Sequence, residues 1–239
     1  MLAISRAAGF YRRACRVLAF DDGAVCACDC PAMPLLNPYL DFFRALTPSL
    51  RRDPSVPPST AAQLAPDWLA FTAAIARHFA WAVPTDEAIA TIRKHSAGVV
   101  EVGAGSGYWA WLMRQAGVNV AAFDLDPPSF TWGEVNRGDE RAAHDHPDKT
   151  LLLCWPPWAT GMASRALAAY GGEHVVYVGE WMGFNAEPNF FASLAWFFEC
   201  IDSVEIPQWY MRDDRLLVFR RRRVPGAVSP HAADSTAPT

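Results

Sequence analysis

The strongest pattern in the chain is an apolar run followed by closely spaced glycines and then by apolar positions at helical intervals. Residues 99–102 are mostly β-branched and apolar, which is typical of a buried parallel strand. Apolar side chains then recur with the spacing of one helix face, at Trp109, Leu112, Met113 and Ala116. Gly117 is placed to end that helix in a left-handed cap. The pattern therefore predicts a strand, a glycine-rich turn and a helix in succession.

Similar patterns predict the other elements of the fold. Strands are expected over residues 118–124, 132–135, 150–155, 174–178, 204–210 and 216–219. Helices are expected over residues 38–48, 67–79, 86–95, 162–170 and 190–198. Thr85 is placed to cap the third of these helices. This alternation of strands and helices is typical of an α/β fold with a mostly parallel sheet.

The composition is that of one globular domain with an extension. The chain has 239 residues, of which 51% are hydrophobic, and this is enough for one sizeable α/β domain. Proline, serine and threonine mark residues 51–63 as a linker or surface loop. We expect a partly disordered extension over residues 1–60, the α/β domain over residues 61–223 and a disordered tail over residues 224–239.

The net charge and the cysteine spacing indicate which kinds of partner are not expected. A net charge of −4 creates no general field that attracts nucleic acid, and no apolar run approaches the roughly 20 residues of a membrane span. Cys26, Cys28 and Cys30 lack the paired spacing of zinc ligands, so we expect no metal and a cytoplasmic protein with reduced thiols. Residues 1–20 carry arginines without acids, which fits either an organelle transit peptide or an ordinary N-terminus from an arginine-rich proteome.

The glycine spacing indicates which ligand the turn accepts. Glycines stand at Gly103, Gly105 and Gly107, whereas a dinucleotide fingerprint would need a glycine where Tyr108 stands. Glu101 lies inside the preceding strand, where a carboxylate repels a pyrophosphate but suits a ligand that carries an ammonium and a sulfonium. Such a ligand also needs a site for its ribose.

An acid at the tip of the second strand supplies that site. Asp124 ends the apolar run 118–123, and an acidic side chain there is placed to hold a ribose diol. With the glycine motif, it resembles motifs one and two of the class I S-adenosyl-L-methionine (SAM) methyltransferases, over roughly residues 80–222. The run Leu152–Pro157, with Gly179 and Glu180, also resembles uncharacterised methyltransferase-like proteins of eukaryotic microbes.

The resemblance implies a fold, a cofactor and a set of cofactor-binding residues. The fold is a Rossmann-like, doubly wound, seven-stranded and mostly parallel sheet with an antiparallel terminal hairpin and an N-terminal helical extension. SAM is the implied cofactor, with Glu101 binding its ammonium group and Asp124 binding its ribose. The three glycines allow the backbone of the loop to approach the cofactor closely. The family often places a residue near the adenine amine in the loop before the fourth strand. Asp139 is placed to accept that hydrogen bond or, alternatively, is a solvated acid.

The end of the fourth strand offers candidate catalytic residues. Trp155, Pro156, Pro157 and Trp158 resemble the [Asp/Asn]-Pro-Pro-[aromatic] motif of methyltransferases that act on amines. In that motif the first side chain and a proline carbonyl accept hydrogen bonds from the amine, and the aromatic residue stacks on the substrate. Trp155 departs from it, because an indole nitrogen only donates. The alternative is a strand terminator with two core tryptophans.

The fifth strand ends on another acid, Glu180. A carboxylate beside aromatic residues is a candidate general base, a ligand for a substrate hydroxyl, or a cap for the next segment. The predicted function is methyl transfer from SAM to an unidentified acceptor, for which a small molecule is favoured and a membrane is not expected. The alternatives are a non-catalytic SAM-binding or interaction protein and a nucleic-acid or protein N-methyltransferase.

Overall fold

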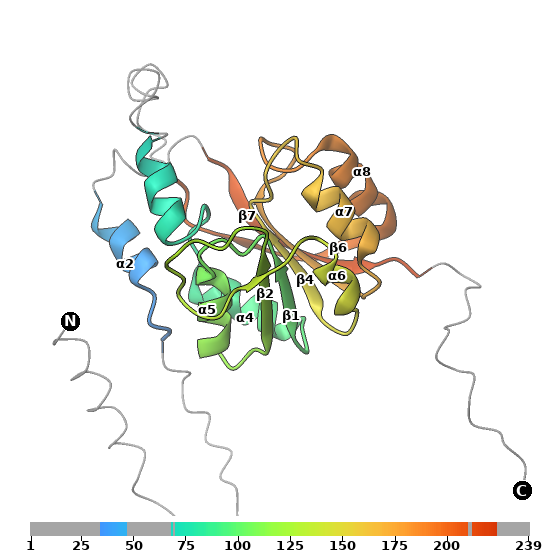
Figure 1. The fold of residues 1–239 in the computed structure, drawn as a ribbon, viewed down its shortest axis with the longest axis horizontal. Coiled ribbons are helices and arrows are strands. Elements are labelled where there is room, and N and C mark those ends of the chain that lie inside the picture. The colour runs from blue at the N-terminus through green and yellow to red at the C-terminus, as the bar shows by residue number, and fades with distance from the viewer. Residues whose placement is uncertain (1–33, 47–67, 69, 210–211, 224–239) are drawn as a thin grey trace, which may run out of the picture. The chain divides into compact units, whose positions relative to one another are not determined.

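One sheet of seven strands runs through the residues that this computed structural model describes, which are 34–46, 68, 70–209 and 212–223 (Figure 1). The strands are β1 (Val99–Val102), β2 (Val120–Asp124), β3 (Asn136–Arg137), β4 (Thr150–Cys154), β5 (His174–Glu180), β6 (Phe198–Glu205) and β7 (Asp214–Arg221). Their order is β3-β2-β1-β4-β5-β7-β6, and β7 runs antiparallel to both β5 and β6, while the other neighbouring pairs are parallel. The predicted Rossmann-like, mostly parallel sheet with an antiparallel terminal hairpin is confirmed.

Helices cover both faces of this sheet. They are α2 (Pro38–Ala45), α4 (Asp86–Lys94), α5 (Tyr108–Gln115), α6 (Ala142–Asp145), α7 (Met162–Ala169) and α8 (Pro188–Phe197), and residues 70–78 are also helical. Successive strand residues point to opposite faces. Val99 and Leu152 therefore pack with α2, α4 and α5, whereas Val100 and Leu151 pack with α6, α7 and α8.

The strand order creates a crevice at one edge of the sheet. From β1 the chain proceeds to β2 on one side, whereas β4 leads to β5 on the other side. In open α/β sheets, ligands bind outside the carboxyl ends of the strands at such a reversal. The ends of β1, β2 and β4 are therefore the place to look for a site.

Local sequence signals explain where two of the helices begin and end. Thr85 caps α4, because its side-chain oxygen accepts a hydrogen bond from the Ala88 amide at 3.1 Å. After α5, Gly117 has a φ of +81°, and the Val118 amide donates back to the Met113 carbonyl at 3.0 Å. This is a Schellman C-cap. Both predicted helix boundaries are confirmed.

The predicted third strand was wrong in position. It was expected over residues 132–135, but β3 contains only Asn136 and Arg137. The Trp132 amide instead donates to the Ser106 carbonyl at 2.9 Å, and its indole nitrogen donates to the His78 carbonyl at 2.6 Å. Aromatic residues are common in strands, so the pattern favoured a strand here. Trp132 instead makes its hydrogen bonds to carbonyls outside the sheet.

The predicted sixth strand was also misplaced. It was expected over residues 204–210, whereas β6 spans Phe198–Glu205 and pairs with β7 alone at the edge of the sheet. An edge strand exposes many of its side chains, and the polar residues at these positions interrupt the hydrophobic pattern from which strands are predicted. Pro207 removes a backbone donor and Trp209 leaves the sheet for a buried aromatic cluster.

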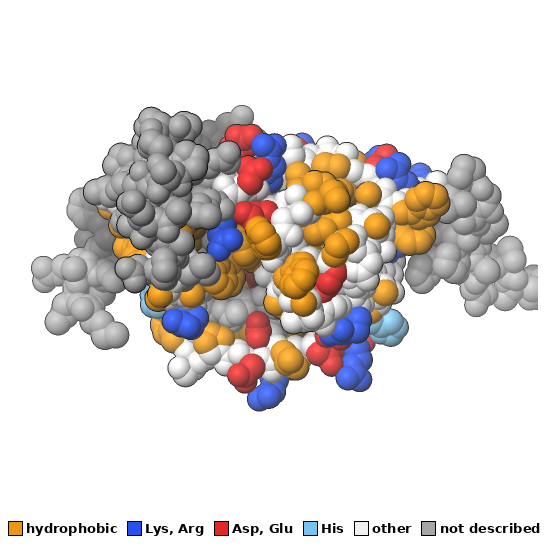
Figure 2. Space-filling view, turned by 90° about the horizontal axis from the view of Figure 1, so that it is seen from above, with side chains coloured by type: hydrophobic (Ala, Val, Ile, Leu, Met, Phe, Trp, Pro, Cys, Tyr) orange, Lys and Arg blue, Asp and Glu red, His pale blue; other side chains and the backbone are white. Residues whose placement is uncertain are grey.

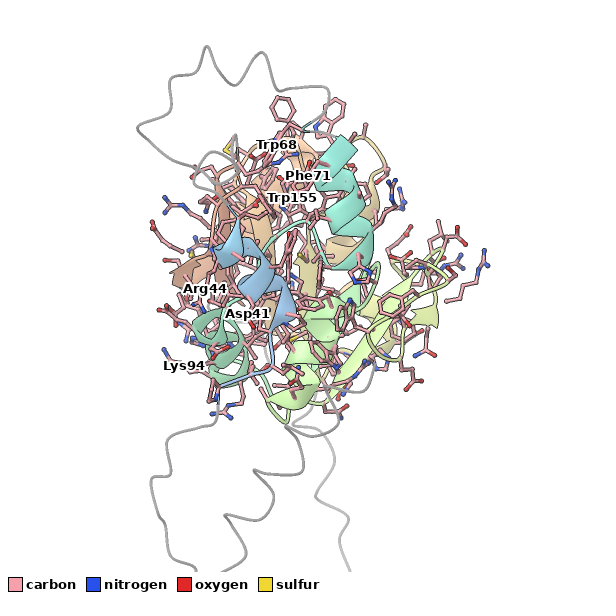
Figure 3. All side chains as sticks on the ribbon, turned by 90° about the vertical axis from the view of Figure 1, so that its left-hand side faces the viewer. Asp41, Arg44, Trp68, Phe71, Lys94 and Trp155 are labelled. Atoms are coloured by element: carbon pink, nitrogen blue, oxygen red, sulfur yellow. The ribbon has the colours of Figure 1, made fainter. Side chains whose placement is uncertain are left out.

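That cluster joins the N-terminal helix to the sheet domain. Trp209 is 2% exposed, and its indole nitrogen donates to the Tyr39 hydroxyl of α2 at 2.8 Å. The rings of Phe43, Trp68 and Phe71 also contact the Trp209 ring, at centroid distances of 4.8, 5.7 and 6.2 Å. Trp68 and Phe71 are labelled in Figure 3. The described part of the predicted extension therefore packs on the same core as the domain.

Other predictions about the ends of the chain fall on residues that the structure does not describe. These are the basic segment 1–20, the cysteine triplet at 26–30 and the tail 224–239, so the domain limits stay predictions. Among the described residues, no helix is long and apolar enough to cross a membrane.

Candidate functional site

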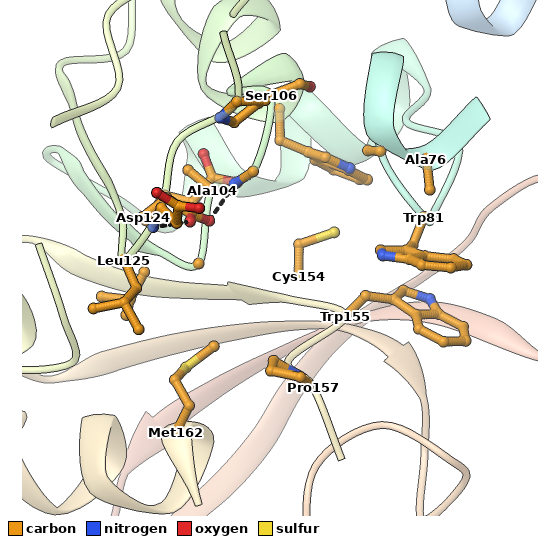
Figure 4. A pocket seen from close by; sticks show the side chains of 18 of the residues that line it. Ala76, Trp81, Ala104, Ser106, Asp124, Leu125, Cys154, Trp155, Pro157 and Met162 are labelled. Carbon is orange, nitrogen blue, oxygen red and sulfur yellow. Dashed lines mark hydrogen bonds between the residues drawn. The ribbon is translucent and has the colours of Figure 1, made fainter. Parts of the chain in front are cut away.

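A cavity of about 660 Å³ opens where the strands reverse order, at the carboxyl ends of β1, β2 and β4 (Figure 4). This volume is within the range of about 300–1,000 Å³ that is typical of ligand pockets. Seen from above the sheet, hydrophobic and acidic side chains surround a hollow near the middle of the face (Figure 2). The cavity brings together many of the residues that the sequence singled out.

The glycine loop forms one wall. Gly103, Gly105 and Gly107 have φ values of +77°, +53° and +71°, which are strained for any residue with a side chain. A Cβ on Gly107 would lie 2.5 Å from the Val135 side chain, whereas a Cβ on Gly105 would meet no protein atom within 4 Å. Gly103 and Gly105 line the cavity, but Gly107 lies outside its lining and begins α5. Gly105 is thus the position that leaves space for a ligand.

Asp124 is tied to this loop from the end of β2. Its Oδ2 accepts a hydrogen bond from the Gly105 amide at 2.8 Å, and its Oδ1 accepts one from the Asp126 amide at 2.9 Å (Figure 4). Because each carboxylate oxygen has a second lone pair, the group retains capacity to accept from a ligand. The loop and the predicted ribose acid therefore lie side by side across one cavity wall.

Glu101 is a buried acid that faces this cavity from β1. The side chain is 1% exposed, and its Oε2 has no hydrogen-bond partner among the described residues. Burial raises the pKa of Glu101 from 4.5 to about 8, although the nearby Arg114 charge opposes that rise. A cationic ligand would supply the missing partner and favour the ionised carboxylate.

Asp139 lies on the rim of the same cavity. Its Oδ1 and Oδ2 accept hydrogen bonds from the backbone and the guanidinium of Arg141, at 3.0 and 3.1 Å, and these bonds hold the pKa of Asp139 below its ordinary value. The carboxylate therefore stays ionised at neutral pH and is able to accept a further hydrogen bond. With Gly138 it forms the part of the lining that directly follows β3.

The candidate catalytic motif after β4 is divided between the cavity and its surroundings. Trp155 and Pro157 line the cavity. Pro156 and Trp158 do not belong to its lining, and Trp158 is 58% exposed. The Trp155 indole donates to Asp214 Oδ1 at 2.7 Å. The indole nitrogen, which is the one polar atom of the Trp155 side chain, is therefore already bonded within the protein.

Two residues of this region carried no clear signal in the sequence. Trp81 follows a helix, where it reads as an ordinary apolar residue, yet its ring stacks on Trp155 with centroids 5.4 Å apart and an angle of 22°. Asp214 stands between two expected strands, where an acid reads as part of a turn, yet it is fully buried. Neither role is visible locally, because each depends on a partner far away in the chain.

Glu180 lies behind this motif and outside the cavity lining. It pairs with Asp214 across β5 and β7, and its Oε1 accepts a hydrogen bond from the Asp213 amide at 3.2 Å. Burial raises the pKa of Asp214 to about 7, the Trp155 bond opposes this, and the Glu180 charge adds to it. The structure therefore places Glu180 beside a buried acid rather than against the space where a ligand would bind.

The two loops that follow β4 and β5 share an unusual backbone. The non-glycine residues with positive φ in the described chain are Trp155, Ala159, Met182 and Ala186. Pro157 and Asn185 form an isolated bridge between the loops, and the Ala186 amide donates to the Pro156 carbonyl at 3.0 Å. Strained residues persist only where their surroundings hold them, and they cluster at binding sites.

Within the described ranges, no group of His, Cys, Asp and Glu side chains is arranged to hold a metal ion. Cys154 also lines the cavity, and burial raises the pKa of its thiol, so the thiol is protonated at neutral pH.

No model of a known protein family matches the chain, and no curated protein matches its sequence. Solved structures with a similar arrangement include 1,6-didemethyltoxoflavin-N1-methyltransferase of Burkholderia thailandensis with S-adenosylhomocysteine (19% identity, 72% of this chain and 93% of that chain, TM-score 0.42). A second is magnesium protoporphyrin IX methyltransferase of Synechocystis PCC 6803 with SAM (13% identity, 57% of this chain and 77% of that chain, TM-score 0.42). A third is an N-methyltransferase of Bradyrhizobium japonicum with S-adenosylhomocysteine (10% identity, 67% of this chain and 91% of that chain, TM-score 0.41). At this level of similarity, none of them assigns a ligand or a residue role to this chain.

Proposed function

We propose that this protein binds SAM in the cavity and transfers its methyl group to an acceptor. The observation that carries the proposal is that one cavity is lined by Glu101, Gly105 and Asp124 together. Residues from two strands and the loop between them thus offer a buried acid, a wall without side chains and a second acid in one place.

The residues present fit the parts of SAM. Glu101 has an unpartnered buried oxygen that matches an ammonium group, and Asp124 has free lone pairs for a ribose diol. Gly105 allows close approach to the backbone, and Asp139 offers an acceptor for the adenine amine. When bound, SAM would supply a methyl group already activated on sulfur, so the task of the chain is to bind, to orient and to exclude water.

Asp124→Ala is expected to weaken SAM binding by about 1–3 kcal/mol, because charged hydrogen bonds to the ribose are lost. Isothermal titration calorimetry with SAM and with S-adenosylhomocysteine measures this change. Asp148→Ala is the matched control, since Asp148 is an exposed acid outside the cavity lining. An unchanged dissociation constant for the Asp124 variant would remove the ribose assignment.

A second function, SAM binding without catalysis, is favoured by one contact. The Trp155 indole donates to Asp214, so the position that accepts an amine hydrogen bond in the [Asp/Asn]-Pro-Pro-[aromatic] motif is unavailable for that role. Incubation of the protein with methyl-labelled SAM and a cell lysate distinguishes the two functions. Label in small molecules, nucleic acid or protein identifies the class of acceptor, whereas tight SAM binding with no transferred label supports the binding protein.

A further inference from the structure

We propose that the methyl acceptor is a planar heteroaromatic molecule that reacts through a ring nitrogen without a hydrogen, as in a pyridine-type ring. This inference rests on the proposed methyl transfer and names the substrate class for the same cavity. Three features carry it, namely an aromatic wall, the lack of a base among the polar groups of residues 155–157 and the charge that the reaction creates.

The first feature is the wall formed by Trp81 and Trp155, both of which line the cavity at the end away from Asp124 (Figure 4). Trp155 is covered by Trp81 and by the Arg212 guanidinium, which lies 4.6 Å from the ring centroid. Trp155 therefore backs Trp81, which is 37% exposed and presents its ring. A flat ring gains the most contact area with such a surface by stacking.

The second feature is that the polar groups of residues 155–157 include no base. The Trp155 indole donates to Asp214, the Pro156 carbonyl accepts from the Ala186 amide, and the Pro157 carbonyl accepts from the Thr160 hydroxyl at 3.0 Å. All three groups are thus engaged within the protein. Each proline carbonyl keeps one lone pair, but a carbonyl does not take up a proton and an indole nitrogen only donates. An amine or hydroxyl acceptor must release a proton during methylation, and these three groups offer no base to receive it.

The third feature is the charge balance of the transfer. The ring nitrogen uses its lone pair to form the N–CH₃ bond, the S–CH₃ bond breaks, and its electron pair returns to sulfur. The positive charge moves from sulfur to the ring, and no proton leaves, so no general base is needed. A cationic ring beside Trp81 faces a π system, and the buried acid Glu101 lines the same cavity.

Three probes of matched shape test the proposal. Isoquinoline, 2-naphthylamine and 2-naphthol share two fused six-membered rings but present a ring nitrogen, an amine and a hydroxyl. With SAM and the full chain, mass spectrometry is expected to show methylated isoquinoline at least about tenfold faster than either other product. Equal or faster methylation of 2-naphthylamine or 2-naphthol would overturn the proposal.

Binding provides an independent readout. In protein saturated with S-adenosylhomocysteine, Trp81→Ala should weaken isoquinoline binding by about tenfold, and Trp81→Phe should restore most of it. Trp196→Ala is the matched control, because Trp196 is 77% exposed on α8 and lies outside the cavity lining. Failure of isoquinoline to bind, or equal binding to Trp81→Ala and the parent protein, would refute the proposed acceptor class.

Calorimetry with SAM alone separates this proposal from the one on which it depends. If SAM binds and isoquinoline neither binds nor reacts, the acceptor class is wrong and the cofactor assignment stands. If SAM itself does not bind, the proposed function fails. Circular dichroism and thermal unfolding of each Trp81 variant show whether the fold is retained.

Discussion

Glu101→Gln is expected to remove most of the affinity for SAM while leaving the fold intact. The substitution keeps the shape of the side chain but deletes the charge that would pair with the ligand ammonium. Loss of one partner from a buried charge pair costs about 2–5 kcal/mol, which is roughly 30-fold or more in the dissociation constant. Calorimetric titration of both proteins with SAM measures the difference.

The same residue makes ligand binding depend on pH. The pKa of Glu101 is raised to about 8 in the folded protein, so below that pH the free protein holds the carboxyl group neutral. SAM affinity is therefore expected to rise as the pH increases toward and through about 8, because less free energy is spent on ionising Glu101. Glu101→Gln should show no such rise, and identical pH profiles for the two proteins would contradict the assignment.

Stability of the free protein should change in the opposite direction. Between about pH 4.5 and pH 8 the folded state retains the Glu101 proton and the unfolded state has lost it, so the folded state binds more protons. The free energy of unfolding attributable to this group therefore falls as the pH rises across that window. Thermal unfolding at several pH values is expected to show a smaller fall for Glu101→Gln.

Gly105→Ala is expected to separate ligand binding from folding. A Cβ at this position meets no protein atom within 4 Å, but Gly105 forms part of the cavity wall, so the added methyl group takes up space next to the ligand. We expect SAM binding to weaken by about 3 kcal/mol, the upper end for overpacking, because the backbone of the loop is held by Asp124 and does not readily yield. The left-handed backbone adds about 1–2 kcal/mol of destabilisation to the folded protein.

Gly117→Ala is the matched control for that variant. Gly117 also has a positive φ, and its Cβ would also meet nothing within 4 Å, but the residue caps α5 outside the cavity lining. The two variants should therefore lose similar stability in chemical denaturation, while only Gly105→Ala loses SAM affinity. Equal SAM affinity for the two variants would place the ligand away from the glycine loop.

Much of the fold was predictable, because its signals are local. The central strand, its glycine turn and the start of α4 at Thr85 depend on neighbouring residues, and all of them are found where the pattern predicts them. The edge strands β3 and β6 were misplaced, since each is bordered on one side only and carries few buried apolar residues. Their positions follow from pairing with β2 and β7.

The candidate site shows the same division. The local patterns indicate which residues stand at the ends of the strands, and a parallel sheet then brings Glu101, Gly105 and Asp124 to one edge. The role of Trp155 follows instead from the fold, because its partner Asp214 lies 59 residues away and the hydrogen bond between them occupies the indole nitrogen. Burial and long-range contacts set such roles and pKa values, and neither is encoded in the order of neighbouring residues.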